Sequence, residues 1–175
     1  MKKSSVSREP GYFDRYIDLV EDIELNEALA QSLQALENLD VATLEALGDR
    51  VYAPGKWTVR DLIQHISDCE RVFQYRALRF ARHDETPLPG FDEDLFAANA
   101  GATRRTLAEL LDELRTLRLS SLQLFRSFDE TALRRKGIMY KMELPVLAVG
   151  FIVVGHQIHH FNILRERYLP LLENA

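Results

Sequence analysis

The sequence predicts an all-α protein, built as a four-helix bundle. Four long stretches carry apolar residues at helical spacing, alternating strand patterns are scarce, and glycine and proline fall mainly between the stretches. At 175 residues, the chain has the length of one domain. Its 46% hydrophobic and 28% charged residues are typical of a globular protein.

The first two long helices are predicted from apolar stripes and capping residues. Leucines recur every three or four positions over residues 23–39, and a short helical turn over residues 41–47 follows with Asp40 as its N-cap. The second long helix begins at Thr58, where Thr58 and Asp61 form a capping-box pattern. Its apolar stripe continues for about six turns.

The third and fourth helices are predicted over residues 103–125 and from Pro145 to near Tyr168. Residues 144–164 contain no acidic or basic side chain and are long enough to span a bilayer. However, this segment holds glycines, amides and histidines, and the rest of the chain is polar. We therefore interpret it as the central helix of the bundle, and we expect no membrane association.

The helical pattern divides the chain into an N-terminal extension (1–22), the bundle (23–170) and a short tail (171–175). Two connections, residues 82–102 and 128–144, are longer than helix connections need to be, which is typical either of functional loops or of covers over bundle ends.

Charge, cysteine content and the N-terminus limit the classes of protein. The net charge of -5 gives no electrostatic reason to expect a nucleic-acid partner. Cys69 is the only cysteine, which excludes an intramolecular disulfide and fits a reducing compartment. No apolar segment follows the two lysines near the N-terminus, so we expect no secretory signal and a cytoplasmic protein.

Three of the five histidines lie within five residues of one another. His156 and His160 are one helical turn apart on the same face, a spacing that can bind one divalent metal ion. A zincin-type protease is excluded, because Gln157 stands where that chemistry needs a glutamate. Spacing alone also allows His159 in place of His160, but we interpret His159 as a packing residue.

His65 is the third candidate ligand, because it lies beside the apolar stripe of the second helix. Three histidines would leave a coordination position open, as in catalytic sites. The alternative is a histidine at the edge of the core, bonded to a backbone carbonyl.

The neighbours of His65 have structural interpretations as well as functional ones. Asp68 could orient a ligand or accept a hydrogen bond from a bound water, but a position on a solvated face or an ion pair with Arg71 or Arg76 is favoured. Cys69 is within reach of a metal but is expected in the core. Trp57 is expected to pack on the end of the helix. We expect His83 in solvent and expect the arginines of the second helix to form a salt-bridged face.

The residues with this chemistry resemble one known family. The segment GKWTVRDL (55–62) followed by His65, together with GHQIHH (155–160), resembles the DinB/YfiT-like superfamily of metalloenzymes, and the likeness extends over residues 25–170. The resemblance implies an up-down-down-up bundle with a long crossover. It also implies a divalent metal, zinc or nickel, held by His65, His156 and His160, and association as a homodimer.

The resemblance also suggests an activity. Some members are S-transferases or isomerases that use a low-molecular-weight thiol such as mycothiol, bacillithiol or glutathione. We therefore expect a metal-dependent enzyme, a thiol-dependent S-transferase acting on an electrophilic small molecule in a stress response. The alternatives are a non-catalytic stress protein that binds metal or a ligand, and a bundle whose histidines hold no metal.

Overall fold

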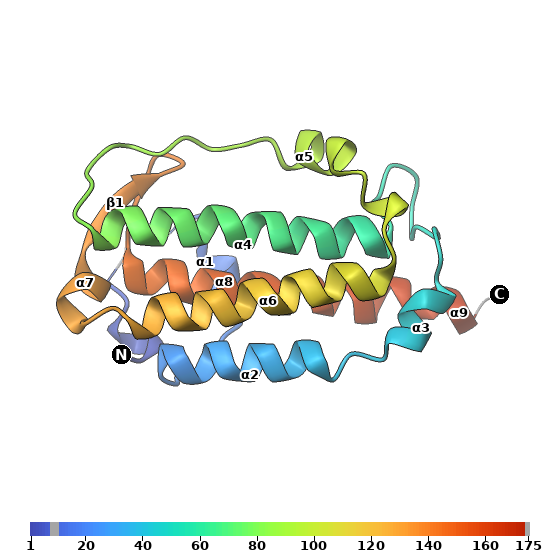
Figure 1. Ribbon diagram of the computed structural model, residues 1–175, viewed down its shortest axis with the longest axis horizontal. Coiled ribbons are helices and arrows are strands. Elements are labelled where there is room, and N and C mark those ends of the chain that lie inside the picture. The colour runs from blue at the N-terminus through green and yellow to red at the C-terminus, as the bar shows by residue number, and fades with distance from the viewer. Residues whose placement is uncertain (8–10, 174–175) are drawn as a thin grey trace.

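A computed structural model describes residues 1–7 and 11–173 of the chain (Figure 1). Its long helices are α2 (Leu25–Glu37), α4 (Val59–Ala81), α6 (Leu107–Arg126) and α8 (Val146–Ile163). In Figure 1, α2 and α8 run in one direction and α4 and α6 run in the other. The predicted four-helix bundle is confirmed, and its up-down-down-up order requires the long crossover from α4 to α6.

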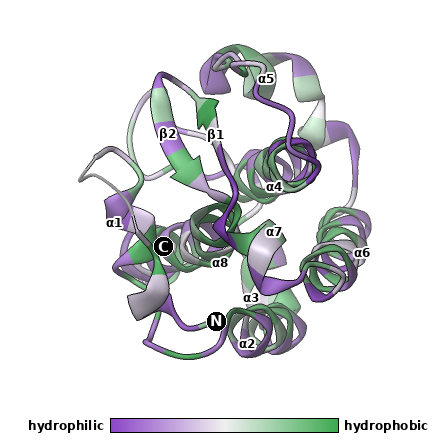
Figure 2. Ribbon diagram, turned by 90° about the vertical axis from the view of Figure 1, so that its left-hand side faces the viewer, coloured by the Kyte–Doolittle hydropathy of each residue, from purple (hydrophilic) through white to green (hydrophobic). Residues whose placement is uncertain are grey.

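Helix α8 is the central helix. It contacts both α2 and α4, and the short helix α1 (Asp14–Ile17) packs on a further side of it, as the end view in Figure 2 shows. Among the described residues, one helical stretch is long and apolar enough to cross a membrane, and 72% of its most apolar window is buried inside the protein. This burial on several sides explains why α8 is apolar all round.

The caps of the helices are largely those predicted. The Asp40 side chain accepts a hydrogen bond from the Thr43 amide at the start of α3 (Val41–Ala46), and Thr58 and Asp61 form the expected capping box of α4. The start of α6 was predicted too early. Thr106 forms a second capping box with Glu109, after a 3₁₀ turn, η2 (Ala102–Arg104). The T-x-x-E pattern that marks this start is present in the sequence.

The two long connections contain more structure than predicted. The crossover carries α5 (Glu93–Ala100), and the second connection carries α7 (Glu130–Arg134) and a hairpin of β1 (Lys136–Met139) and β2 (Met142–Pro145). This hairpin was not predicted from the sequence, for a physical reason. Its strands are four residues long, and its turn places Tyr140 and Lys141 at φ values of 50° and 66° without the glycine or asparagine that usually marks such a turn.

The described segments before α2 and after α8 pack against the bundle. The 3₁₀ turn η1 (Lys3–Ser5) precedes α1, and the N-terminal segment contributes Phe13, Tyr16, Ile17 and Val20 to the apolar core. At the other end, α8 continues into a π-helical turn, η3 (Leu164–Tyr168), and then α9 (Pro170–Glu173).

The core consists of two apolar clusters with a polar layer where they meet. One cluster includes Ile17, Phe80 and Phe151, and the other includes Leu47, Ile63 and Leu110. All four long helices contribute buried polar side chains to the layer between them: Ser32, Gln64, His65, Ser67, Glu70, Arg118, Ser121, His156, Gln157 and His160. The predicted metal ligands belong to this layer.

Candidate metal centre

The structure brings the three predicted ligands together inside the bundle. His65 comes from α4, and His156 and His160 come from successive turns of α8. The Nε2 atom of His156 lies 3.1 Å from the Nε2 atom of His65 and 3.1 Å from that of His160. All three side chains are at least 93% buried, with exposed fractions of 5%, 4% and 7%.

Hydrogen bonds between the rings cannot satisfy all of the ring nitrogens in this arrangement. An imidazole Nε2 carries either one hydrogen or one lone pair, so the Nε2 atom of His156 can make one good hydrogen bond to another ring, not two. The buried Nδ1 atom of His160 has no partner among the described residues. A single cation between the rings would instead accept all three Nε2 lone pairs. The donor set therefore fits a divalent metal ion.

Burial keeps the three rings uncharged. Desolvation, together with the charge of His159, lowers the pKa of His65 to about 4. Desolvation and the neighbouring histidines lower the pKa of His160 to about 2, and they hold the pKa of His156 well below its ordinary value. A neutral imidazole is the form that binds a metal, so the site is in the ligating state at neutral pH.

The other two histidines lie outside this arrangement. The ring of His159 packs edge-to-face on Tyr16, with ring centroids 5.4 Å apart, and is only partly buried. His83 lies in the crossover with its side chain 72% exposed, beside Glu85, as expected of a residue in solvent.

Cys69, which is expected in the core from its sequence position, is a further possible donor. Its side chain is buried as expected, but its Sγ atom is also 3.7 Å from both ring nitrogens of His65. The ligand atoms of His65, Cys69 and His156 lie within 4.8 Å of one another, so these three residues could also hold a metal ion. Burial raises the pKa of the Cys69 thiol, which keeps it protonated without a metal.

Packing residues hold the rings in place. Trp57, expected on the helix end, lies with its ring centroid 4.6 Å from that of His65, and its carbonyl accepts a hydrogen bond from the Tyr168 hydroxyl. Beside His156, a Cβ atom on Gly155 would come within 1.9 Å of the Tyr16 carbonyl oxygen. Only glycine allows α1 to approach α8 this closely, and the Tyr16 ring then packs on His156.

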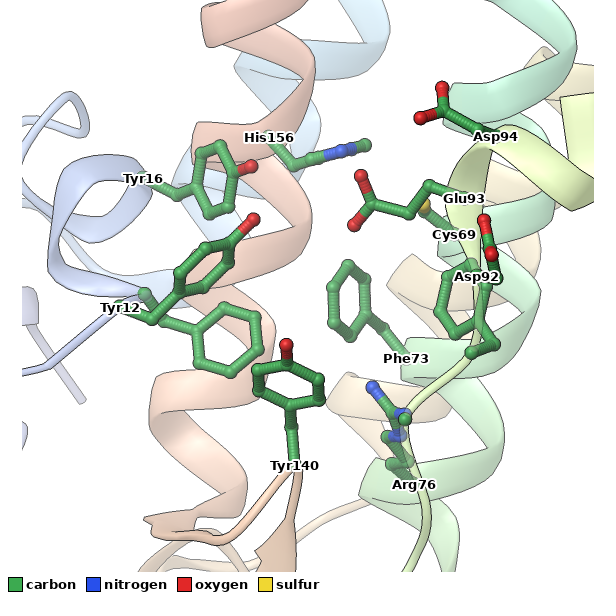
Figure 3. Close-up of a pocket in the computed structure, with 13 residues that line it drawn as sticks. Tyr12, Tyr16, Cys69, Phe73, Arg76, Asp92, Glu93, Asp94, Tyr140 and His156 are labelled. Carbon is green, nitrogen blue, oxygen red and sulfur yellow. The ribbon is translucent and has the colours of Figure 1, made fainter.

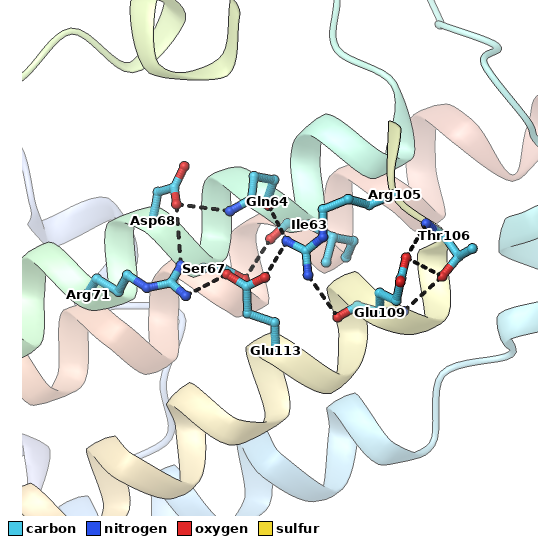
Figure 4. A network of polar contacts seen from close by, with 9 residues as sticks. All are labelled: Ile63, Gln64, Ser67, Asp68, Arg71, Arg105, Thr106, Glu109 and Glu113. Carbon is cyan, nitrogen blue, oxygen red and sulfur yellow. Dashed lines mark hydrogen bonds and ion pairs between the residues drawn. The ribbon is translucent and has the colours of Figure 1, made fainter. Parts of the chain in front are cut away.

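Asp68 does not take part in the site. It accepts a hydrogen bond from Gln64 at 2.9 Å and pairs with Arg71 at 3.5 Å, within a network that joins α4 to α6 (Figure 4). Of the structural alternatives favoured for Asp68, the structure contains the ion pair with Arg71. Arg60 and Arg79 also pair with carboxylates, as predicted for a salt-bridged face, but Arg76 does not fit this prediction because it is buried.

A cavity of about 260 Å³ opens beside the histidines (Figure 3). His156 and Cys69 form part of its wall, and aromatic side chains from α1 and the residues just before it, from α4, from the crossover and from the hairpin turn form much of the rest. Sequence reasoning could not find this cavity, because its wall combines segments that are far apart in the chain.

A four-helix bundle whose core presents converging histidines to a cavity belongs to the class of helical proteins that can hold a metal between their helices. The model of the DinB superfamily matches residues 24–164, and the chain belongs to that superfamily.

Solved structures with the same fold include the following two. YfiT from Bacillus subtilis, described as a probable metal-dependent hydrolase with an unusual four-helix bundle topology, is 20% identical, with 91% of each chain covered and a TM-score of 0.63. The mycothiol-dependent maleylpyruvate isomerase is 16% identical with a TM-score of 0.58; the match covers 86% of this chain and 60% of that one. No curated protein sequence matches the chain.

Proposed function

We propose that the protein is a metal-dependent enzyme that holds a zinc or nickel ion with His65, His156 and His160 and acts on a small molecule in the adjacent cavity. One observation carries the proposal: the Nε2 atom of His156 lies 3.1 Å from those of both other rings. Nitrogens bound to one tetrahedral zinc at ordinary bond lengths are about 3.3 Å apart, close to this separation.

Two nucleophiles are candidates for the reaction. One similar structure is described as a probable metal-dependent hydrolase, and the other protein depends on mycothiol. We favour a low-molecular-weight thiol, and hence S-transfer to an electrophilic small molecule in a stress response, with hydrolysis as the second candidate. When bound, the metal would supply a Lewis acid that lowers the pKa of a thiol or of water.

The residues around the metal ligands have separate roles in this proposal. Trp57 packs on the ring of His65 and Tyr16 packs on the ring of His156, which fixes the orientation of these two ligands. The Glu93 carboxylate points into the cavity on the side of His156 (Figure 3). Although Glu93 is exposed overall, partial desolvation in the cavity wall raises the pKa of its carboxyl, which makes this carboxylate a better acceptor for a proton released by the nucleophile.

The metal content of untagged protein tests the ligand assignment. We expect His65→Ala, His156→Ala and His160→Ala each to lose most of the bound metal, whereas His159→Ala retains it. Cys69→Ser is the control for the alternative donor set. If Cys69→Ser loses the metal while His160→Ala keeps it, then His65, Cys69 and His156 are the ligands instead.

Turnover is a separate measurement. Metal-loaded protein would be incubated with glutathione, bacillithiol or mycothiol and an electrophilic acceptor such as 1-chloro-2,4-dinitrobenzene, and in parallel with nitrophenyl esters. His156→Ala provides the metal-deficient control. Metal binding without turnover in any reaction would favour the non-catalytic binding protein, and wild-type protein without metal would contradict the proposal.

A further inference from the structure

Arg76 is a buried cation without an anionic partner among the described residues. Its side chain is only 4% exposed. Its Nη2 atom donates to the Pro89 carbonyl at 2.7 Å, and its Nη1 atom lies 4.0 Å from the sulfur of Met139. Arg118 is also buried, yet it is paired with Glu70 through two nitrogens. A buried charge without a counter-charge lowers the stability of the fold. The described environment of Arg76 therefore lacks an anion.

The unpaired guanidinium lies in the wall of the cavity that His156 also lines. Figure 3 shows Arg76 and His156 at opposite ends of this cavity, with aromatic rings between them. The guanidinium carbon is 5.9 Å from the ring centroids of both Phe73 and Phe91. These rings restrict the guanidinium on two sides, and its free N–H groups remain available to a molecule in the cavity.

The charges of the cavity wall are separated along its length. The carboxylates of Asp92, Glu93 and Asp94 lie toward the end with His156, and Arg76 lies at the other end (Figure 3). A bound anion would therefore be repelled from the acidic end and attracted to Arg76. The aromatic wall between the two ends favours an apolar body.

We propose that this cavity binds a small organic carboxylate, with its carboxylate on Arg76 and its apolar body among the aromatic side chains. A monoanion fits better than a doubly charged phosphate, because the cavity offers one cation and several carboxylates. The proposal rests on the proposed function only in placing the reacting group of the substrate toward His156.

A matched pair of ligands tests the proposal: 3-phenylpropionate and its uncharged isostere 3-phenylpropanamide. Their dissociation constants would be measured by NMR titration on protein stripped of metal with a chelator. Metal-free protein is used because a carboxylate can also bind directly to a metal ion. We expect wild-type protein to bind the carboxylate at least about 10-fold more tightly than the amide, as for a charged hydrogen bond in a buried site.

Substitutions then assign the preference to Arg76. We expect Arg76→Gln to reduce the ratio of the two dissociation constants to about 1, and Arg76→Lys, which keeps the charge, to retain part of the preference. Arg79→Gln is the matched control, since Arg79 lies one turn further along α4 and pairs with Asp84 outside the cavity. It should keep the wild-type ratio. Thermal melts identify any loss of folding.

The ratio separates binding from a merely structural role. If Arg76 only fastens the loop at Pro89 to α4, Arg76→Gln would weaken both ligands equally and leave the ratio unchanged, which would overturn the proposal. Failure of metal-free wild-type protein to prefer the carboxylate would also overturn it. Because no metal is present, failure of the metal site would show in metal content and would leave this result intact.

Discussion

Two polar clusters share the middle of the bundle, and they differ in how completely their groups are paired. In the arginine cluster, Arg118 donates to both oxygens of Glu70 and to the Ser32 hydroxyl, and Ser121 donates to Glu70 at 2.6 Å. In the histidine cluster, two rings converge on one nitrogen of His156, and the Nδ1 atom of His160 has no partner among the described residues.

This difference in pairing distinguishes polar residues that stabilise the fold from polar residues that can bind a ligand, within the same core. The charges of the arginine cluster are paired within the protein, so they need no ligand as a counter-charge. Their hydrogen bonds connect three helices through Ser32 on α2, Glu70 on α4 and Arg118 on α6. The histidine cluster keeps donor atoms that its own protein partners do not satisfy, and it borders a cavity. We therefore expect the arginine cluster to determine stability and the histidine cluster to determine ligand binding.

The largest expected effect comes from breaking the arginine cluster. Arg118→Met leaves Glu70 buried without its counter-charge, so we expect the free energy of unfolding to fall by about 3–5 kcal/mol. Urea denaturation measures this change. Arg115→Met is the control on the same helix, because Arg115 pairs with Glu37 at the surface and its loss should cost about 0.2–1 kcal/mol. Equal losses in the two variants would contradict the comparison.

Removal of the metal should act on stability by a different route. We expect holo protein to be more stable than apo protein by about 3–4 kcal/mol when free metal exceeds its dissociation constant 100- to 1,000-fold. The apo protein should remain helical, because the two apolar clusters do not depend on the ion. Circular dichroism melts with and without chelator measure the difference in stability between holo and apo protein.

His156→Ala supplies the control for this experiment, since metal should no longer change its melting temperature. An apo protein that unfolds would show that the histidine cluster is structural. The expectation that the arginine cluster determines stability and the histidine cluster determines ligand binding would then be wrong.

A smaller loss is expected at the edge of the arginine cluster. Ser32→Ala removes the hydroxyl that accepts from Arg118, which leaves one buried guanidinium N–H unpaired. We expect the free energy of unfolding to fall by about 1–3 kcal/mol, with unchanged metal content. Loss of metal in this variant would show that the two clusters are coupled.

Much of the fold could be predicted from local pattern. Apolar stripes and the caps at Asp40 and Thr58 are signals within a few residues, and they predicted the long helices and the short helix α3. The hairpin was not predicted, because its tight turn has Tyr140 and Lys141 where glycine or asparagine is usual.

The candidate site was partly predictable for the same reason. Spacing placed His156 and His160 on one face, and the stripe of α4 directed His65 toward the core. A signal for the arginine cluster was also present: Glu70 and Arg118 interrupt the apolar stripes of their helices with opposite charges. The cavity depends on contacts between α1, the crossover and the hairpin, which no local pattern specifies.

The smallest effect is expected at Gln157, a member of the polar layer on α8 that contacts Ser32 of α2. Its Nε2 atom donates to the Ser32 carbonyl at 2.8 Å, but its buried Oε1 atom has no partner among the described residues. Gln157→Met loses a hydrogen bond worth about 0.5–1.5 kcal/mol and removes an unsatisfied acceptor that costs a similar amount. The net change in the free energy of unfolding should therefore be below about 1 kcal/mol. Urea denaturation and metal analysis of the same preparation measure both properties. A fall in the free energy of unfolding above about 2 kcal/mol would mean that Oε1 accepts a hydrogen bond in solution, for instance from a buried water. The polar groups between the two clusters would then be more completely paired than the described contacts indicate.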